Sequence, residues 1–159
     1  MTDRKTIDEF LAHRRLAVVG VSRNPRDFSR AVFREFEKQG YDAVPVNPAA
    51  ADVEGKRCFA HVSEIEPPVK AALLFTPGDR TEEAVDDCAA AHVDHIWMHR
   101  GAGGRGAVND RAVKFCETHG ISVVPGECPL MFLGHPAWFH RMHAFVRKLK
   151  GQYPRSAQH

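Results

Sequence analysis

The segment 20–30 combines residue types that bind phosphate groups in proteins. It reads GVSRNPRDFSR, so a single glycine precedes two serines and three arginines. A guanidinium donates paired hydrogen bonds to phosphate oxygens, and a serine hydroxyl can add another. If a helix begins in this segment, its free backbone N–H groups also favour an anion. The candidate ligands are Ser22, Arg23, Arg26, Ser29 and Arg30; an ordinary surface loop before a capped helix is the alternative.

This segment departs from the dinucleotide fingerprint G-x-G-x-x-G. Gly20 is followed by Ser22 where NAD enzymes place a second glycine that lets the pyrophosphate approach the backbone. A second test concerns the acidic residue that binds the ribose diol after the next strand, where this chain has Asn47 and Pro48. Both departures count against an NAD(P)-dependent dehydrogenase.

Two further loops follow apolar runs. Phe75, Thr76 and Pro77 carry no charge and could present an apolar and backbone surface to an adenine or an aliphatic chain, although they also suit an ordinary turn. The glycine-rich segment 101–106 resembles a phosphate cradle in composition. It lacks the Gly-Lys-Ser/Thr ending of a P-loop, so we interpret it as a flexible loop.

The C-terminal part contains residue types found in zinc and thiol chemistry: Cys128, His135, His140 and His143. Their spacing matches no standard zinc site, so no metal site is predicted. A small thiol-dependent or NAD(P)-dependent enzyme using Cys128 and His140 is the enzymatic alternative, but a reactive thiolate needs a lowered pKa that a sequence does not reveal. The four cysteines form no C-x-x-C pair, and we expect reduced, mostly buried thiols and no catalytic residues.

The candidate loops are positioned by alternating strands and helices. Apolar runs predict strands at 16–21, 43–46, 71–75, 95–98 and 121–124, and 3.6-residue periodicity predicts helices at 28–39, 80–91 and 107–118. A leading helix over 5–13 could be capped by Thr6 or Asp8, and Pro45 should lie at a strand end or on an edge strand. We therefore expect an α/β fold: a doubly wound, Rossmann-like parallel sheet with helices on both faces.

Right-handed crossovers suggest the strand order 3-2-1-4-5, counted along the chain. The ligand crevice would then lie at the carboxyl ends of the first and fourth strands. We expect one domain over 1–150, including the leading segment 1–13 and a C-terminal helix over 137–150, followed by a disordered tail at 151–159. The aromatic residues of 137–150 would pack on the core, or could seal a homodimer.

Charge and hydropathy exclude two classes of partner. The chain has 22 basic and 20 acidic residues among 159, and the basic ones are scattered, so nucleic acid is not expected. No apolar stretch approaches the roughly 20 residues of a membrane span, and the N-terminus leads into no signal-peptide core. We expect a cytoplasmic protein with a small-molecule ligand.

Several short motifs in a fixed order resemble one known family. They are Val19-Gly20-Val21-Ser22, Pro25, Ser29, Gly40-Tyr41, Pro45-Val46-Asn47-Pro48, Gly55 and Trp97. In this order they resemble the stand-alone CoA-binding domain proteins, relatives of the CoA-binding domain of the succinyl-CoA synthetase α-subunit. The resemblance implies a Rossmann-like fold that holds coenzyme A or an acyl-CoA across the strand ends.

The resemblance nominates Gly20, Ser22, Pro25, Ser29, Asn47 and Pro48 as ligand-binding residues. Together with Val21, Arg23, Arg26, Phe75, Thr76 and Pro77 they are the predicted CoA site. The synthetase's phosphorylated histidine lies in a separate domain, so a non-catalytic carrier or sensor is expected rather than a ligase. A regulatory interaction protein that uses 137–150 as its interface is a further alternative. The run 125–132 departs from the Asp-Arg-Cys-type turn common in the family, so this segment could have a role that is particular to one subgroup of the family.

Overall fold

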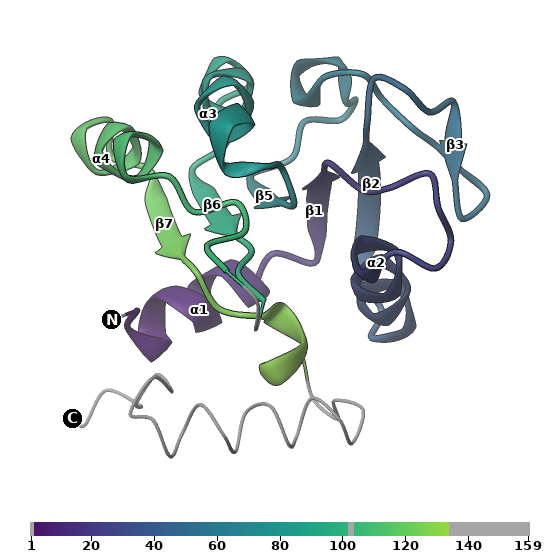
Figure 1. The fold of residues 1–159 in the computed structure, drawn as a ribbon, viewed down its shortest axis with the longest axis horizontal. Coiled ribbons are helices and arrows are strands. Elements are labelled where there is room, and N and C mark those ends of the chain that lie inside the picture. The colour runs from purple at the N-terminus through teal and green to yellow at the C-terminus, as the bar shows by residue number, and fades with distance from the viewer. Residues whose placement is uncertain (1, 102–103, 134–159) are drawn as a thin grey trace.

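The protein is built around a parallel sheet of five strands (Figure 1). The structure, a computed structural model, describes residues 2–101 and 104–133, so the predicted helix at 137–150 and tail at 151–159 lie outside the described residues. The sheet has the order β2-β1-β5-β6-β7. Its strands are β1 (Arg15–Val19), β2 (Asp42–Val46), β5 (Ala71–Leu74), β6 (His95–Met98) and β7 (Ser122–Pro125). All the pairings in this sheet are parallel.

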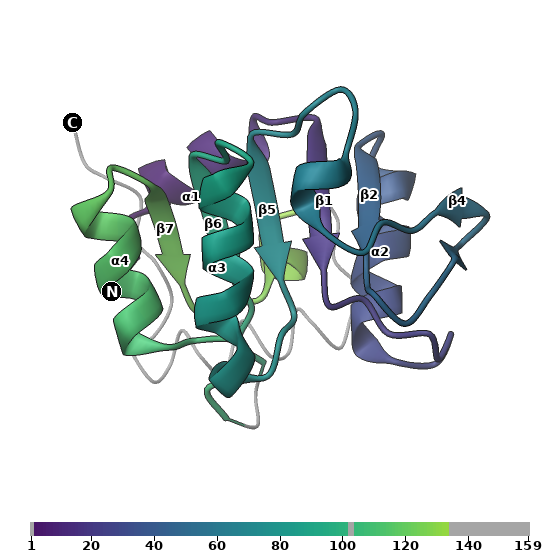
Figure 2. The ribbon, with the colours of Figure 1, turned by 90° about the horizontal axis from the view of Figure 1, so that it is seen from above.

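Helices cover both faces of the sheet (Figure 2). One face carries α1 (Arg4–Leu11) and α2 (Phe28–Lys38), and the other carries α3 (Thr81–Ala90) and α4 (Asp110–Thr118). Short 3-10 helices lie at Val62–Glu64, Gly78–Arg80 and Pro129–Met131. The predicted Rossmann-like α/β fold class is confirmed.

Successive residues of each strand point to opposite faces, which divides the core into two layers. Leu16 and Val18 of β1 pack with α1 and α2, whereas Ala17 and Val19 pack with α3 and the 3-10 helix at Val62–Glu64. All four are buried. Because both faces are buried, these strands have continuous apolar sequences, and this is why the sequence located them within a residue or two.

The strand order differs from the predicted 3-2-1-4-5. Counted along the chain it is 2-1-3-4-5, because β5 pairs with β1 on one side, Val18 opposite Leu73, and with β6 on the other. After β2 the chain forms the small hairpin β3 (Asp52–Val53) and β4 (Lys56–Arg57) instead of a crossover helix. It then passes along β2, where the N–H of Phe59 donates to the carbonyl of Pro45 at 3.0 Å, and returns across β1.

This correction moves the expected ligand crevice. In doubly wound sheets of this order, ligands bind at the carboxyl ends of the first and third strands, where the winding reverses. Here that point lies between β1 and β5, rather than beside β1 and β6 as the predicted order required.

Two local expectations have different outcomes. Pro45 lies in β2, an edge strand, as predicted. The N-cap of α1 is Asp3, whose side chain accepts from the N–H of Lys5, and not Thr6 or Asp8. Asp3 lies directly before the first helical turn, and this is the position from which a short side chain reaches the free N–H groups. In the part of the chain that the structure describes, no helix is long and apolar enough to cross a membrane.

Candidate nucleotide-binding crevice

Gly20 ends β1 and brings two loops together at the carboxyl edge of the sheet. Its φ is +82°, and a β-carbon built there would lie 3.1 Å from the carbonyl carbon of Phe75 and 3.1 Å from the nitrogen of Thr76. Only glycine combines this backbone conformation with such a close approach at low cost. The first loop and the turn after β5 are therefore in van der Waals contact at the switch point of the sheet.

The first loop is held by its own polar residues before α2 begins. The N–H of Ser22 donates to Ser29 Oγ at 2.9 Å, and the N–H of Asn24 donates to Ser22 Oγ at 3.0 Å. Asp27 caps α2 by accepting from both the N–H and the hydroxyl of Ser29, at 2.9 and 2.6 Å. Ser22 and Ser29 thus shape the loop, and an anion at this helix start would approach a carboxylate that already occupies the cap position.

Arg30 is an internal anchor of this loop. It is 8% exposed, and its guanidinium binds Glu54 through Nε at 3.0 Å and through Nη2. Its Nη1 donates to the carbonyls of Ser22 and Arg23 at 3.3 and 3.1 Å. Arg30 and Arg34 lower the pKa of the Glu54 carboxyl, with the hydrogen bond from Arg30 as the largest cause. Arg30, a sequence candidate for phosphate binding, instead fixes the backbone of the loop.

Asn47 joins the loop after β2 to the loop after β1. Its Nδ2 donates to the carbonyl of Val21 at 2.8 Å, and its Oδ1 accepts from the N–H of Ala49 at 2.8 Å. Pro48 beside it is exposed. The amide therefore positions Val21, which is fully buried, at the start of the first loop.

Replacing Asn47 with alanine should leave the buried carbonyl of Val21 without its partner. We expect this change to lower the free energy of unfolding by about 1–3 kcal/mol, the usual cost of an unsatisfied buried polar group. Urea unfolding measures it. Asn24 is the control, because it is exposed and its side chain accepts only from the N–H of Arg26 among the contacts described, so Asn24→Ala should cost clearly less. Equal losses of unfolding free energy in the two variants would contradict the role of Asn47 as the partner of the Val21 carbonyl.

The turn after β5 forms the opposite wall of the crevice. Thr76 Oγ1 lies 2.9 Å from Thr81 Oγ1, and the Thr81 hydroxyl donates to the carbonyl of Ala107 at 2.6 Å. Thr81 is fully buried, whereas Pro77 is exposed at the rim. The turn is therefore tied to the segment after β6 as well as to Gly20.

Three aromatic rings meet above this turn, and two of them were not predicted. His99 follows β6, and its ring centroid lies 4.6 Å from that of Phe75 and 5.3 Å from that of Phe28 at the start of α2. Phe28 is the one exposed large apolar residue identified in the described chain, at 37%. The signal in the sequence was position alone: both residues stand where a strand ends or a helix begins. The planes of these rings are tilted against each other by 34° and 41°, and such an aromatic cluster offers faces on which a planar base can pack.

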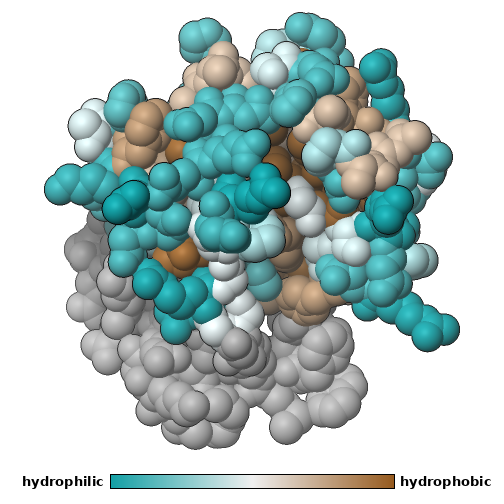
Figure 3. Space-filling model, turned by 45° about the horizontal axis from the view of Figure 1, so that its top comes forward, coloured by the Kyte–Doolittle hydropathy of each residue, from teal (hydrophilic) through white to brown (hydrophobic). Residues whose placement is uncertain are grey.

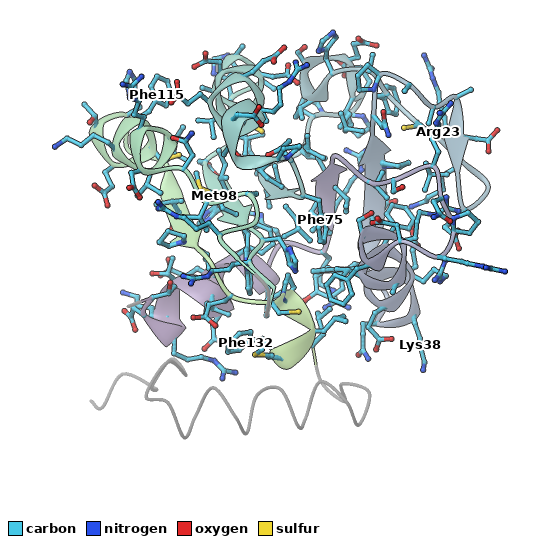
Figure 4. All side chains as sticks on the ribbon, in the orientation of Figure 1. Arg23, Lys38, Phe75, Met98, Phe115 and Phe132 are labelled. Carbon is cyan, nitrogen blue, oxygen red and sulfur yellow. The ribbon has the colours of Figure 1, made fainter. Side chains whose placement is uncertain are left out.

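The face around these loops is polar, with apolar residues visible in a hollow near its centre (Figure 3). Arg23 projects from the outer part of the first loop, well away from the central Phe75 (Figure 4). Arg23, Pro25 and Arg26 are all exposed. The structure thus brings Gly20, Val21, Ser22, Ser29, Asn47, Phe75 and Thr76 together, and it leaves Arg23, Pro25, Arg26, Pro48 and Pro77 at the rim.

The thiol of Cys128 lies in the hydrophobic core. Cys128 is 1% exposed, and Cys58, Cys88 and Cys116 are also buried, as predicted. Burial raises the pKa of the Cys116 thiol to about 11. His135, His140 and His143 lie outside the described residues. Trp97 is a core residue whose Nε1–H donates to the carbonyl of Glu127 at 3.1 Å.

A doubly wound sheet whose loops converge at the switch point defines the class, an α/β domain of the Rossmann type. Within that class, the model of the CoA binding domain matches residues 14–134. The chain belongs to this family.

Relatives and solved structures agree with the assignment. The protein YneT of Bacillus subtilis, described as uncharacterized, is 24% identical over 115 residues, which cover 72% of this chain and 82% of YneT. The α-subunit of an ADP-forming acetate–CoA ligase II from Pyrococcus furiosus is 26% identical over 128 residues; the match covers 77% of this chain but only 28% of that subunit. A solved structure of a hypothetical protein from Pyrococcus horikoshii has a TM-score of 0.73 at 25% identity, and covers 81% of this chain and 87% of that one.

Proposed function

We propose that the chain binds coenzyme A or an acyl-CoA at the carboxyl edge of β1 and β5, and acts as a carrier or sensor rather than a catalyst. The observation that carries the proposal is Gly20, whose backbone contacts the turn at Phe75 and Thr76 at the switch point of a chain that the CoA binding domain model spans. In such sheets the glycine after the first strand allows the tight turn that brings the loops together at the edge where nucleotides bind.

The parts of the crevice suit the parts of CoA. Arg23 and Arg26 are exposed on the first loop and can donate forked hydrogen bonds to its phosphates. The clustered rings of Phe28, His99 and Phe75 offer apolar faces to an adenine or to the start of the pantetheine arm.

The thiol-dependent alternative lacks a structural observation in its favour. A catalytic thiolate needs solvent access and a lowered pKa, whereas Cys128 is almost completely buried. The NAD(P) alternative would need an acid at the end of β2, where Asn47 instead binds the carbonyl of Val21.

Isothermal titration with CoA and acetyl-CoA tests the proposal, with NAD⁺ and ADP as comparison ligands. We expect one CoA per chain, with weaker binding of ADP and none of NAD⁺. Ligand at about 100 times its Kd should add roughly 2.7 kcal/mol to stability in thermal unfolding. If neither acetyl-CoA nor free CoA gives binding heat or a thermal shift at millimolar concentration, the proposal is refuted. Tight binding of NAD⁺ would favour the dehydrogenase class.

The exposed arginines of the first loop should contribute to CoA affinity through charge. We expect the double variant R23A/R26A to raise the Kd for CoA by about tenfold or more, because charge-assisted hydrogen bonds each contribute about 1.5–3 kcal/mol. The Kd of this double variant for CoA should also depend less steeply on the salt concentration. Lys38→Ala is the matched control, since Lys38 is an exposed cation at the opposite end of α2 (Figure 4). If Lys38→Ala weakens binding as much, the effect reflects net charge and not the loop.

A further inference from the structure

Two histidines and an aspartate meet at the edge of the sheet opposite the crevice. His13 lies in the turn between α1 and β1, while Asp94 and His95 lie at the start of β6. One potential ligand atom from each of the three lies within 4.8 Å of the others. Residues this distant in sequence meet here because β1 and β6 are parallel and both begin at this edge.

The side chains of this cluster already face one another. The imidazole centroids of His13 and His95 are 4.6 Å apart with their planes tilted by 49°, and His95 Nε2 lies 3.6 Å from Asp94 Oδ1. The other ring nitrogen of His95, Nδ1, is buried and has no hydrogen-bond partner among the described residues. A buried polar atom without a partner is costly, so the described chain does not satisfy both nitrogens of this ring.

We propose that His13, Asp94 and His95 bind a divalent transition ion of the zinc class. Two imidazoles and one carboxylate are ligands that Zn²⁺ accepts at about 2.0–2.2 Å, which places neighbouring ligand atoms about 3.3 Å apart in a tetrahedron. The Asp94 to His95 distance of 3.6 Å is already close to this value, and the remaining separations need side-chain movements of the order of an ångström. Nitrogen ligands favour zinc over magnesium or calcium.

The bound ion would connect the leading helix to the sheet. α1 packs through Phe10, whose ring meets Trp97 of β6 edge to face with centroids 5.3 Å apart, and His13 follows directly after this helix. Asp94 is 55% exposed, so the ion would reach the site from solvent and could keep a water as its fourth ligand. From His95 to the crevice residue His99 the chain advances about 13 Å along β6, so the two sites are separate.

Zn²⁺ titration of the untagged chain in metal-depleted buffer tests the proposal. We expect one ion per chain, and at least tenfold weaker binding in His13→Ala and in Asp94→Asn, since losing even an outer partner of a metal ligand costs 10–100-fold in affinity. Co²⁺ should give a visible absorption band in the wild type that both variants lose. His61→Ala is the matched control, because His61 lies 3.9 Å from Asp87, outside the three-residue cluster, and should leave the affinity unchanged.

The remaining histidines require a second control. A variant with alanine at His135, His140 and His143 should retain the ion if the cluster is the site. The proposal is overturned if Zn²⁺ binding survives in both His13→Ala and Asp94→Asn, or if it disappears only in the triple variant. Circular dichroism and thermal melting of the apo variants establish that they fold. CoA titration should be unchanged in His13→Ala, so that failure of one site is distinguishable from failure of the other.

Discussion

Replacing Gly20 with alanine is expected to lower the free energy of unfolding by about 2–5 kcal/mol. A residue with a β-carbon pays about 1–2 kcal/mol to adopt the left-handed conformation, and Gly20 has a φ of +82°. The new β-carbon would also press on backbone atoms of Phe75 and Thr76 at 3.1 Å, and forcing atoms into a packed site usually costs another 1–3 kcal/mol. Urea unfolding measures the loss.

Gly55 separates the two causes. It has a similar φ of +76°, but a β-carbon there would meet no atom within 4 Å. Gly55→Ala should therefore lower the free energy of unfolding only by the conformational cost, about 1–2 kcal/mol. Because Gly20→Ala also pushes the turn at Phe75 and Thr76 away from the first loop, it should abolish the proposed CoA binding, whereas Gly55→Ala should not. If both variants lose equal stability and bind alike, the contact between the two loops has no energetic role.

The sequence predicted the elements of the fold more reliably than their order. Strands buried on both faces are continuous apolar runs, so β1, β5 and β6 were each located within a residue or two at either end. Periodicity, however, carries no information about which strand lies beside which. The position of β5 depends on the connection at 47–70, which contains a small hairpin and a single 3-10 turn, and for which the sequence predicted no element.

In the candidate site, residues whose contacts are local could be placed from the sequence, whereas contacts between distant segments could not. Gly20 follows a strand and Asn47 follows the next, so their place at the crevice could be inferred. The pairing of Arg30 with Glu54 spans 24 residues and has no sequence pattern, because charged residues are common on every surface. The contact of His99 with Phe28 and Phe75, like the cluster of His13 with Asp94 and His95, exists only once parallel strands bring separate loops to one edge.

Replacing Glu54 with glutamine should destabilise the protein by about 1–3 kcal/mol at neutral pH, between the values for exposed and buried ion pairs. Breaking a buried ion pair from one side costs about 3–5 kcal/mol, because the remaining charge loses its partner in a poorly solvated place. The Arg30 side chain is 10% exposed and that of Glu54 is 25% exposed, so solvent screens the pair in part. Glutamine keeps the shape and removes only the charge. Urea unfolding of both proteins measures the difference.

The pH dependence of this loss identifies its cause. The hydrogen bond from Arg30 lowers the pKa of the Glu54 carboxyl in the folded state below its ordinary value. The stabilisation is therefore complete above the unfolded pKa and is lost as the pH falls through the folded one. The difference between the wild type and Glu54→Gln should thus be constant from pH 6 to 8 and should shrink in acid. A difference that stays the same at low pH would assign the loss to packing and not to charge.

The ion pair of Arg30 and Glu54 should also affect the affinity for the proposed ligand. Arg30 holds the carbonyls of Ser22 and Arg23, so a guanidinium released from Glu54 no longer fixes the loop that carries Arg23 and Arg26. Glu54→Gln should then weaken CoA binding although Glu54 itself need not touch the ligand. The exposed pair of Arg80 and Glu83, 3.2 Å apart, provides the control: Glu83→Gln removes an ion pair of about 0–1 kcal/mol and leaves the first loop intact. Affinity that falls in Glu54→Gln and not in Glu83→Gln would show that the loop is bound in a conformation that the ion pair prepares in advance.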